Sequence, residues 1–217
     1  MERKEMETFK NTEGKPILLK MVQVIQENKD YLGQVDGEIG DGDHGANMNK
    51  GFTLFEKKYR EQDFGFTEGL ELLGNVLLNE IGGSMGPIYG TIFLSMCEAG
   101  EDFAEIGLDE FLAMLTHARQ ELFQIVDARE GDKTLVDCLS PAVEALAAAL
   151  KGKRKFSEGL EEMCMAARNG KEQTRNLIAK YGRASRLGQR SVGVLDAGAV
   201  SCCLLLEAMA SGIEELL

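Results

Sequence analysis

The chain has 217 residues, of which 44% are hydrophobic, so we expect a single domain over residues 1–217 with a sizeable core. Its 36 acidic and 24 basic residues give a net charge of −12, which repels nucleic acid and anionic membranes at long range. The first ten residues are highly charged and no apolar run approaches 18 residues, so neither a secretory signal nor a transmembrane span is expected. These features predict a cytoplasmic protein that holds any polyphosphate ligand through metal and local donors.

The cysteines agree with this location. None of the five forms a C-x-x-C pair, and their odd number in a chain of this length is typical of buried thiols in a reducing compartment. Neither a zinc site nor a disulfide is indicated. The five residues are Cys97, Cys138, Cys164, Cys202 and Cys203.

Apolar residues recur with helical spacing from the start of the chain. Pro16 suits the first position of a helix that we expect over about residues 16–30. Further along, Met48, Phe52, Phe55 and Tyr59 are spaced i, i+4, i+7 and i+11, as on the buried face of an amphipathic helix. These aromatic residues therefore indicate packing rather than ligand recognition.

Later segments continue the helical pattern. Thr67 is a candidate N-cap for a helix that ends at Gly82-Gly83, and a further helix is expected over residues 109–126. His117 in that helix has no acidic or cysteine partner in the sequence, which indicates a surface residue. Ser140 and Pro141 resemble the N-cap and first position of a helix that restarts. With no strand pattern and about eight helices joined by short turns, the sequence predicts an all-α antiparallel bundle.

Residues 36–50, DGEIGDGDHGANMNK, are the most unusual stretch. Asp36, Asp41 and Asp43 lie within eight positions, where their like charges repel one another unless a cation lies between them. Converging carboxylates are the ligands that Mg²⁺ prefers, and this ion keeps open positions for water and phosphate. The stretch therefore predicts a magnesium and phosphate site. The alternative, an acidic capping loop at a helix N-terminus, remains open, whereas the EF-hand pattern is absent.

The turn at residues 82–90, GGSMGPIYG, is the second unusual stretch. It contains four glycines and a proline and runs into an apolar helical series that contains Ile88, Ile92 and Met96. Backbone N–H groups at a helix N-terminus bind phosphate without any basic side chain. The turn is thus a candidate phosphate site, and a plain helix hairpin is the alternative.

Two polar loops complete the set. Loop 129–134 precedes a helical run and has the composition to reach a nucleotide, while the basic turn at 151–159 indicates only a solvated connection. Residues 182–201 form a long glycine-rich segment, and loops of this length within a domain are usually functional or disordered. Arg183 and Arg190 make this segment a candidate nucleotide clamp. Asp196 also fits a simpler role as the N-cap of the last helix.

Four motifs together resemble the nucleotide-binding L subunit of dihydroxyacetone kinase, the DhaL family. They are DGEIGDGDHGANMNKGF, GGSMGPIYGT, GDKTLVDCLSPAV and GRASRLGQRSVGVLDAGAVS, and their order and spacing match over nearly the whole chain. The resemblance implies an eight-helix up-and-down barrel that binds ADP or ATP at one end through two Mg²⁺ ions. It also implies a phosphotransferase that needs a separate K subunit, which binds the short ketose covalently.

The resemblance carries roles over to individual residues. The implied metal ligands are Asp36, Asp41 and Asp43. The residues implied to lie beside the phosphates are His44, Gly45, Ala46, Asn47, Gly83, Ser84, Met85 and Gly86. The residues implied to line the rest of the nucleotide site are Gly131, Ser140, Arg183, Asp196, Ala197 and Gly198. No general base is assigned.

The chain departs from the family pattern at two motifs. Met85 stands where the family usually has serine, and Val194 and Ala197 replace the histidine and proline of the family's last loop. The substrate therefore stays open between dihydroxyacetone and a ketotetrose such as erythrulose. The family also implies possible partners beyond the K subunit: a phosphotransferase-system M subunit as phosphodonor, a transcription regulator, or a second copy of the chain. A regulatory nucleotide-binding module and a nucleotide-independent metal-binding scaffold are the alternatives to a kinase subunit.

Overall fold

The structure is a computed structural model that describes residues 7–217. Within this range the α-helices are α1 (Lys15–Glu27), α2 (Lys29–Ile39), α3 (His44–Tyr59), α4 (Phe66–Glu80), α5 (Met85–Gly100), α6 (Leu108–Ile125), α7 (Val136–Lys151), α8 (Phe156–Gln173) and α9 (Ala197–Glu214). Short 3-10 helices are η1 (Asn11–Glu13), η2 (Thr174–Asn176) and η3 (Arg183–Ser191). The predicted all-α class is confirmed, but the described residues contain more helices than the expected eight.

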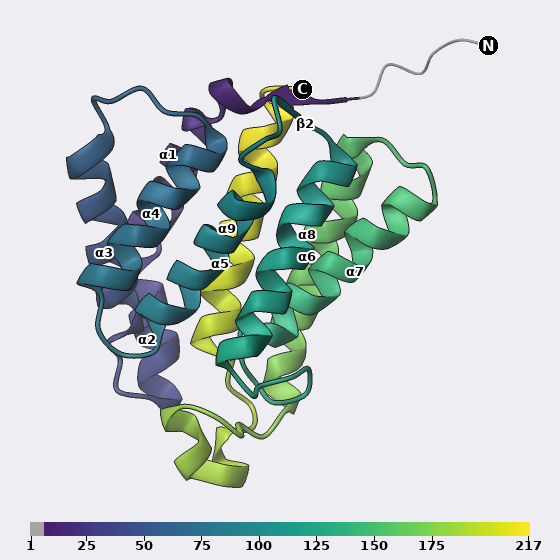
Figure 1. The fold of residues 1–217 in the computed structure, drawn as a ribbon. Coiled ribbons are helices and arrows are strands. Elements are labelled where there is room, and N and C mark those ends of the chain that lie inside the picture. The colour runs from purple at the N-terminus through teal and green to yellow at the C-terminus, as the bar shows by residue number, and fades with distance from the viewer. Residues whose placement is uncertain (1–6) are drawn as a thin grey trace.

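The long helices run antiparallel to one another, and α9 lies among them as one member of the bundle (Figure 1). α9 packs against α1 on one side and against α7 and α8 on the other. Most residues of its sequence, AGAVSCCLLLEAMASGIE, are buried, and beyond the first turn the residues that are not buried form one stripe of Leu204, Glu207, Ser211 and Glu214. The N- and C-terminal ends of the described chain lie at one end of the bundle, and η3 projects from the opposite end (Figure 1).

The composition of α9 overturns one expectation. Over Ala197–Glu214 its mean hydropathy is 1.4, so among the described residues this helix is long and apolar enough to cross a membrane, although we expected no such run. In the structure, 72% of the window is buried inside the protein. A helix that buries most of its surface against its neighbours in a bundle needs the same composition. The expected absence of a secretory signal depends on residues 1–10, of which residues 1–6 lie outside the described part of the chain.

The first expected helix, over residues 16–30, is wrong at its C-terminal end. α1 starts with Pro16 in its first turn, as predicted, but stops at Glu27, where the Asn28 side chain donates to the Val24 carbonyl at 2.8 Å. The chain then re-enters a helix, α2, whose buried face carries Leu32, Val35 and Ile39. Asp36 therefore lies on the last turn of a helix rather than in a loop.

Two predicted caps are wrong. α4 begins at Phe66, and the cap comes from Asn11, whose Oδ1 accepts from the Thr67 N–H at 3.0 Å. α7 does not restart at Ser140, because it runs continuously from Val136 to Lys151 with Pro141 inside it. By contrast, the Asp196 prediction is confirmed: its side chain accepts from the Ala199 N–H at 2.7 Å at the start of α9.

The N-terminal segment crosses the end of the bundle opposite η3. Its two-residue strand β1 (Phe9–Lys10) pairs antiparallel with β2 (Glu105–Ile106), whereas we expected no strands. The carboxylate of Glu7 accepts from the Ser157 N–H at 2.9 Å and from its hydroxyl at 2.8 Å. The backbone hydrogen bond from Ser157 is the main reason why the pKa of Glu7 falls to about 2. This carboxylate joins the N-terminal segment to the start of α8.

The remaining sequence expectations concern the core and the surface. All five cysteines are buried free thiols. His117 is half-buried at the surface, as predicted, but its Nε2 lies 3.3 Å from Glu98 Oε2 on the neighbouring helix α5. The long segment 182–201 is ordered by η3, which bends at Gly188.

Candidate functional site

Alternate helices of the bundle begin at the same end. The first residues of α3, α5, α7 and α9 are His44, Met85, Val136 and Ala197, and all four line one cavity. The first turn of a helix presents N–H groups that have no partner within the helix, and the helix dipole makes this end positive. Four such ends around one cavity form an environment that favours anions, in a chain whose net charge is −12.

The cavity has a volume of about 770 Å³, which is within the range of small-molecule sites. It brings together segments that are more than 150 residues apart in the chain. The sequence-predicted residues that line it are Asp36, Asp41, Asp43, His44, Asn47, Gly83, Ser84, Met85, Arg183, Asp196, Ala197 and Gly198.

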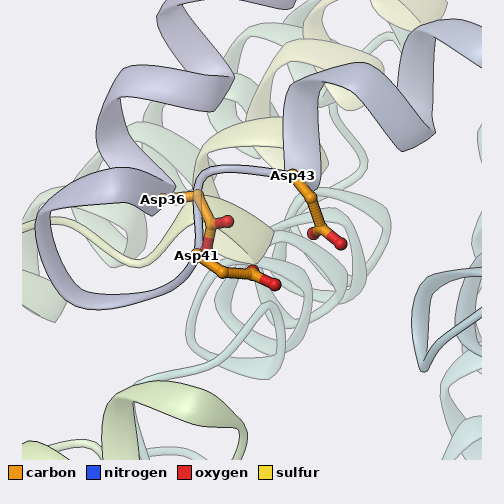
Figure 2. Close-up of side chains that lie close together, drawn as sticks. All are labelled: Asp36, Asp41 and Asp43. Atoms are coloured by element: carbon orange, nitrogen blue, oxygen red, sulfur yellow. The ribbon is translucent and has the colours of Figure 1, made fainter.

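The three aspartates lie at the edge of this cavity. Each offers a carboxylate oxygen, and these oxygens all lie within 4.8 Å of one another. Figure 2 shows Asp36 and Asp41 side by side and Asp43 facing them from the start of α3. Gly42 makes the tight turn between Asp41 and Asp43 possible, because its φ of +77° belongs to the left-handed region that favours glycine. The short turn thus brings the three carboxylates of the motif together in one cluster.

The donor set fits a hard divalent cation. It consists of oxygen only, which suits Mg²⁺, and it has no cysteine or histidine member. Asp41 and Asp43 are exposed and Asp36 is half-buried, so solvent and a polyphosphate have access to the cluster. Arg183 of η3 lies against it, with its guanidinium 2.8 Å from Asp41 Oδ2. The same arginine therefore connects the carboxylate cluster to the projecting segment.

A buried hydrogen-bond chain lies behind the aspartates. His44 Nε2 is 2.8 Å from Ser201 Oγ, which is 2.6 Å from the Tyr89 hydroxyl. The Tyr89 and Ser201 hydroxyls are both within hydrogen-bond distance of the Gly198 carbonyl. Burial lowers the pKa of His44, against the opposing effect of Asp36 and Asp43. These hydrogen bonds fix the starts of α3, α5 and α9 relative to one another.

A buried lysine, Lys133, also lines the cavity. Lys133 is 1% exposed, and its ammonium donates to the Thr174 carbonyl at 2.5 Å and to the Val194 carbonyl. Burial lowers the pKa of Lys133 and raises the pKa of Asp196 to about 7. Lys133 thus ties loop 129–134 to the segment that leads into α9.

Five expected site residues do not line the cavity. Gly45 is buried where α3 packs on α2, and Ala46 is exposed on the outer side of α3. Gly86 lies behind the wall, where a Cβ would be 2.2 Å from the Ile81 carbonyl oxygen. Ser140 is 2% exposed inside α7, and Gly131 lies in the loop outside the cavity, where its N–H donates to Asp137.

Sequence reasoning missed several residues of the cavity wall. Lys133 had a signal, because it lies in loop 129–134, which we expected to reach a nucleotide. The apolar members had none, since each occupies a position with the spacing of a core residue or of an ordinary turn. These missed residues include Ile39, Ile88, Tyr89, Ile125, Val126, Ala128, Leu135 and Tyr181.

Comparison with known proteins identifies the family. The DAK2 domain matches residues 38–211, which is most of the chain. The chain belongs to the DAK2 domain family. Within this family it is 33% identical over 195 residues to the ADP-binding subunit DhaL of PEP-dependent dihydroxyacetone kinase from Escherichia coli (strain K12), covering 88% of this chain and 92% of that protein. The resemblance to DhaL that the four motifs indicated is confirmed.

Other DAK2 relatives differ in how much of their length is matched. A DhaL subunit of PEP-dependent dihydroxyacetone kinase 1 from Listeria innocua is 35% identical over 186 residues, covering 85% of this chain and 88% of that protein. L-erythrulose 1-kinase from Mycolicibacterium smegmatis is 31% identical over 193 residues, covering 86% of this chain but 33% of that protein.

A solved structure shares the fold. The dihydroxyacetone kinase from C. freundii, in complex with AMP-PNP and Mg²⁺, superimposes with a TM-score of 0.69 at 22% identity. The match covers 97% of this DAK2 domain chain and 36% of that kinase chain. The present chain therefore corresponds to about a third of a longer kinase polypeptide.

Proposed function

We propose that this chain is the ADP- or ATP-binding and Mg²⁺-binding subunit of a dihydroxyacetone-type kinase, built as a single DAK2 domain. In this role it transfers a phosphoryl group to a short ketose held by a separate sugar-binding subunit, and it works in the cytoplasm. The observation that carries the proposal is the position of three carboxylates beside four helix N-termini in one cavity. Its similarity to ADP-binding DhaL subunits over nearly their whole length supports the nucleotide assignment.

The cavity offers groups for each part of a nucleotide. Asp36, Asp41 and Asp43 would hold the Mg²⁺, for which the resemblance implies two ions, and this charge would neutralise the charge that develops on the phosphate oxygens. The backbone at the starts of α3 and α5, within residues 44–47 and 83–85, suits the phosphates. Arg183 and residues 196–198 at the start of α9 complete the polar wall. The apolar residues that line the cavity suit the planar adenine ring of the nucleotide.

Phosphoryl transfer requires positioning and electrostatic stabilisation more than covalent chemistry from the protein. In this chain the positioning comes from rigid helix starts, which the hydrogen-bond chain through Ser201 holds together. Donors that are already oriented need no rearrangement when charge moves in the transition state. The geometry thus suits a subunit that presents a terminal phosphate at an open rim.

The acceptor sugar is assigned to another protein. Of the two histidines, His44 lines the cavity with its Nε2 bonded to buried Ser201, and His117 lies at the surface beside Glu98, so we assign neither as a covalent anchor for a ketose. Some relatives are named as PEP-dependent and one as PTS-dependent, which favours a phosphotransferase-system protein as phosphodonor. Relatives named as erythrulose kinases favour erythrulose as the second candidate substrate.

The test uses the intact chain. Isothermal titration calorimetry should show ADP binding in Mg²⁺ and a large loss of affinity in EDTA. Alone with Mg-ATP and dihydroxyacetone or erythrulose, the chain should form no sugar phosphate. Addition of the cognate sugar-binding subunit should start turnover, with ATP or with a phosphorylated phosphotransferase-system protein as donor. Sugar phosphorylation by the isolated chain would contradict the proposed division of labour.

A further inference from the structure

The segment that leads into α9 has a charge opposite to that of the rest of the chain. Residues 173–195 contain five basic residues and no acidic residue, although the whole chain has 36 acidic and 24 basic residues. The five are Arg175, Lys180, Arg183, Arg186 and Arg190. A basic segment of this length in a chain with a net charge of −12 is a local reversal of the electrostatic field.

Three of these cations have partners within the protein. Arg175 is 3.2 Å from Glu172, Lys180 is 2.5 Å from Asp132, and Arg183 is 2.8 Å from Asp41. Arg186 and Arg190 are exposed and form no ion pair with any residue in the part of the chain that the structure describes. Two positive charges at the end of the bundle are therefore available to another molecule.

These two arginines lie outside the cavity. η3 projects beyond the end of the bundle (Figure 1), and its contribution to the cavity wall ends at Ala184. Arg183 lines the cavity, whereas Arg186 and Arg190 do not, so the expected role of Arg190 in a nucleotide clamp is wrong. A function in binding the nucleotide itself does not explain them.

Exposed apolar side chains accompany the two arginines. Ile178 is 44% exposed and Val192 is 36% exposed, and Tyr181, which also lines the mouth of the cavity, is 41% exposed, all within the basic segment. A surface that combines tyrosine and arginine with aliphatic groups has the composition of the centre of a protein interface. Nucleic acid would use the cations but not the aliphatic groups, and the net charge of the chain repels it.

The base of the projecting segment is fixed. Ser191 is fully buried, and its hydroxyl accepts from the Ala179 N–H at 2.9 Å and donates to the Gly188 carbonyl at 2.7 Å. The Gly193 N–H donates to the Arg175 carbonyl at 2.7 Å. A surface that is held in shape before binding loses less conformational entropy when a partner docks.

We propose that Ile178, Tyr181, Arg186, Arg190 and Val192, which we call the η3 surface, dock a carboxylate-rich, partly apolar face of the sugar-binding subunit. This inference rests on the proposed function, because it names the surface through which that subunit reaches the cavity. The partner meets a repulsive field over most of this acidic chain and an attractive one at η3. Docking there places the acceptor across the open mouth of the cavity.

The experiment compares two double charge reversals of equal size. The test variant is Arg186→Glu with Arg190→Glu. The control is Lys153→Glu with Arg154→Glu, in the exposed turn between α7 and α8 at the opposite end of the bundle (Figure 1). Sugar phosphate formation is measured at saturating Mg-ATP against the concentration of the sugar-binding subunit, and Mg-ADP affinity is measured by calorimetry.

In the test variant, the apparent KM for the sugar-binding subunit should rise by about tenfold or more, because charges at an interface rim act mainly on association. The kcat at saturation, the Mg-ADP affinity and the control variant should change less than about twofold. Added NaCl should raise the wild-type KM and leave that of the test variant nearly constant.

Three outcomes overturn the inference. An unchanged KM for the sugar-binding subunit in the test variant refutes docking at the η3 surface while leaving the proposed function intact. A parallel loss of Mg-ADP affinity in that variant assigns the arginines to the nucleotide instead. A wild-type chain that binds Mg-ADP but neither binds the sugar-binding subunit nor turns over with it overturns the inference and the proposed function together.

Discussion

Replacing Asp43 with asparagine should change stability in opposite directions with and without metal. Without metal, Asp43 lies within 4.8 Å of carboxylate oxygens on both Asp36 and Asp41. Two unit charges at that distance in water repel by about 0.9 kcal/mol, and screening by 0.1 M salt reduces this value. The asparagine side chain keeps the shape of the aspartate and removes both repulsions.

The loss of a favourable charge at the N-terminus of α3 reduces the stability that Asp43→Asn gains without metal. Asp43 is the N-cap residue of α3, where a negative charge near the helix N-terminus contributes about 0.3–1 kcal/mol. Asparagine is as good an N-cap residue as aspartate, so only the charge effect is lost. The balance predicts that the metal-free variant is more stable than wild type by about 0.5–1 kcal/mol. In a chain of this length that corresponds to a rise in Tm of about 1–4 °C.

Mg²⁺ and ADP should make wild type more stable than Asp43→Asn, the reverse of the metal-free order. A ligand at about 100 times its Kd stabilises the native state by about 2.7 kcal/mol, and this gain requires the carboxylates that hold the cation. Wild type should therefore gain far more than Asp43→Asn and become the more stable protein. Urea unfolding in low-salt EDTA and in Mg-ADP measures both states. Asp63→Asn, an exposed aspartate between α3 and α4, is the matched control and should show neither effect.

Two results would refute this reasoning. If Asp43→Asn is less stable than wild type in EDTA, the carboxylates do not repel one another as their positions require. If Mg-ADP stabilises both proteins equally, the aspartates do not hold the cation, and the cluster is an acidic cap. Added NaCl gives an internal check, because it should remove the metal-free gain.

Three further predictions test other parts of the structure. Glu7→Gln should lose about 1–2 kcal/mol of unfolding free energy at pH 7. Because the native pKa of Glu7 is lowered from 4.5 to about 2, the urea unfolding curves of the variant and wild type should converge as the pH falls through that range. A stability difference that does not change with pH would contradict this role of Glu7. Gly86→Val should weaken ADP binding in calorimetry, since even a Cβ at Gly86 would lie 2.2 Å from the Ile81 carbonyl oxygen. Met85→Ser should keep or modestly improve the affinity for ADP. If the two variants bind ADP equally well, the turn does not position phosphate donors. Tyr89→Phe should cost about 1 kcal/mol in urea unfolding, and no loss would show that its hydroxyl contributes nothing to the buried chain.

The parts of the fold that depend on neighbours in the sequence were predictable. Asp41 and Asp43 are separated by one glycine, so a local turn is enough to place them together. The Asp196 cap is equally local. Asp36 lies on α2 although Gly33 and Gly37 weaken helix propensity there, because burial of the apolar face of α2 maintains the helix.

Contacts between distant segments were not predictable. Asn11 caps α4 from 56 residues upstream, so Thr67 appeared to be the best available cap. Lys133 lies in a polar loop, where a lysine is normally solvated. Its burial is possible because its ammonium donates to the carbonyls of Thr174 and Val194. Ser140 fits an N-cap when read alone, but the packing of α7 against its neighbours keeps that helix continuous through Pro141.

The antiparallel order of the helices explains how so acidic a chain offers a site for a polyphosphate. In an up-and-down arrangement every second helix begins at the same end, so α3, α5, α7 and α9 direct the positive ends of their dipoles to one place without a lysine or arginine in the first turn of these helices. The carboxylates at the same end would repel phosphate on their own. A divalent cation between the two sets of charges removes that conflict, because it binds the carboxylates and the phosphate oxygens together. Metal and nucleotide should therefore bind cooperatively, with ADP affinity in EDTA falling far more than the loss of a single hydrogen bond would produce.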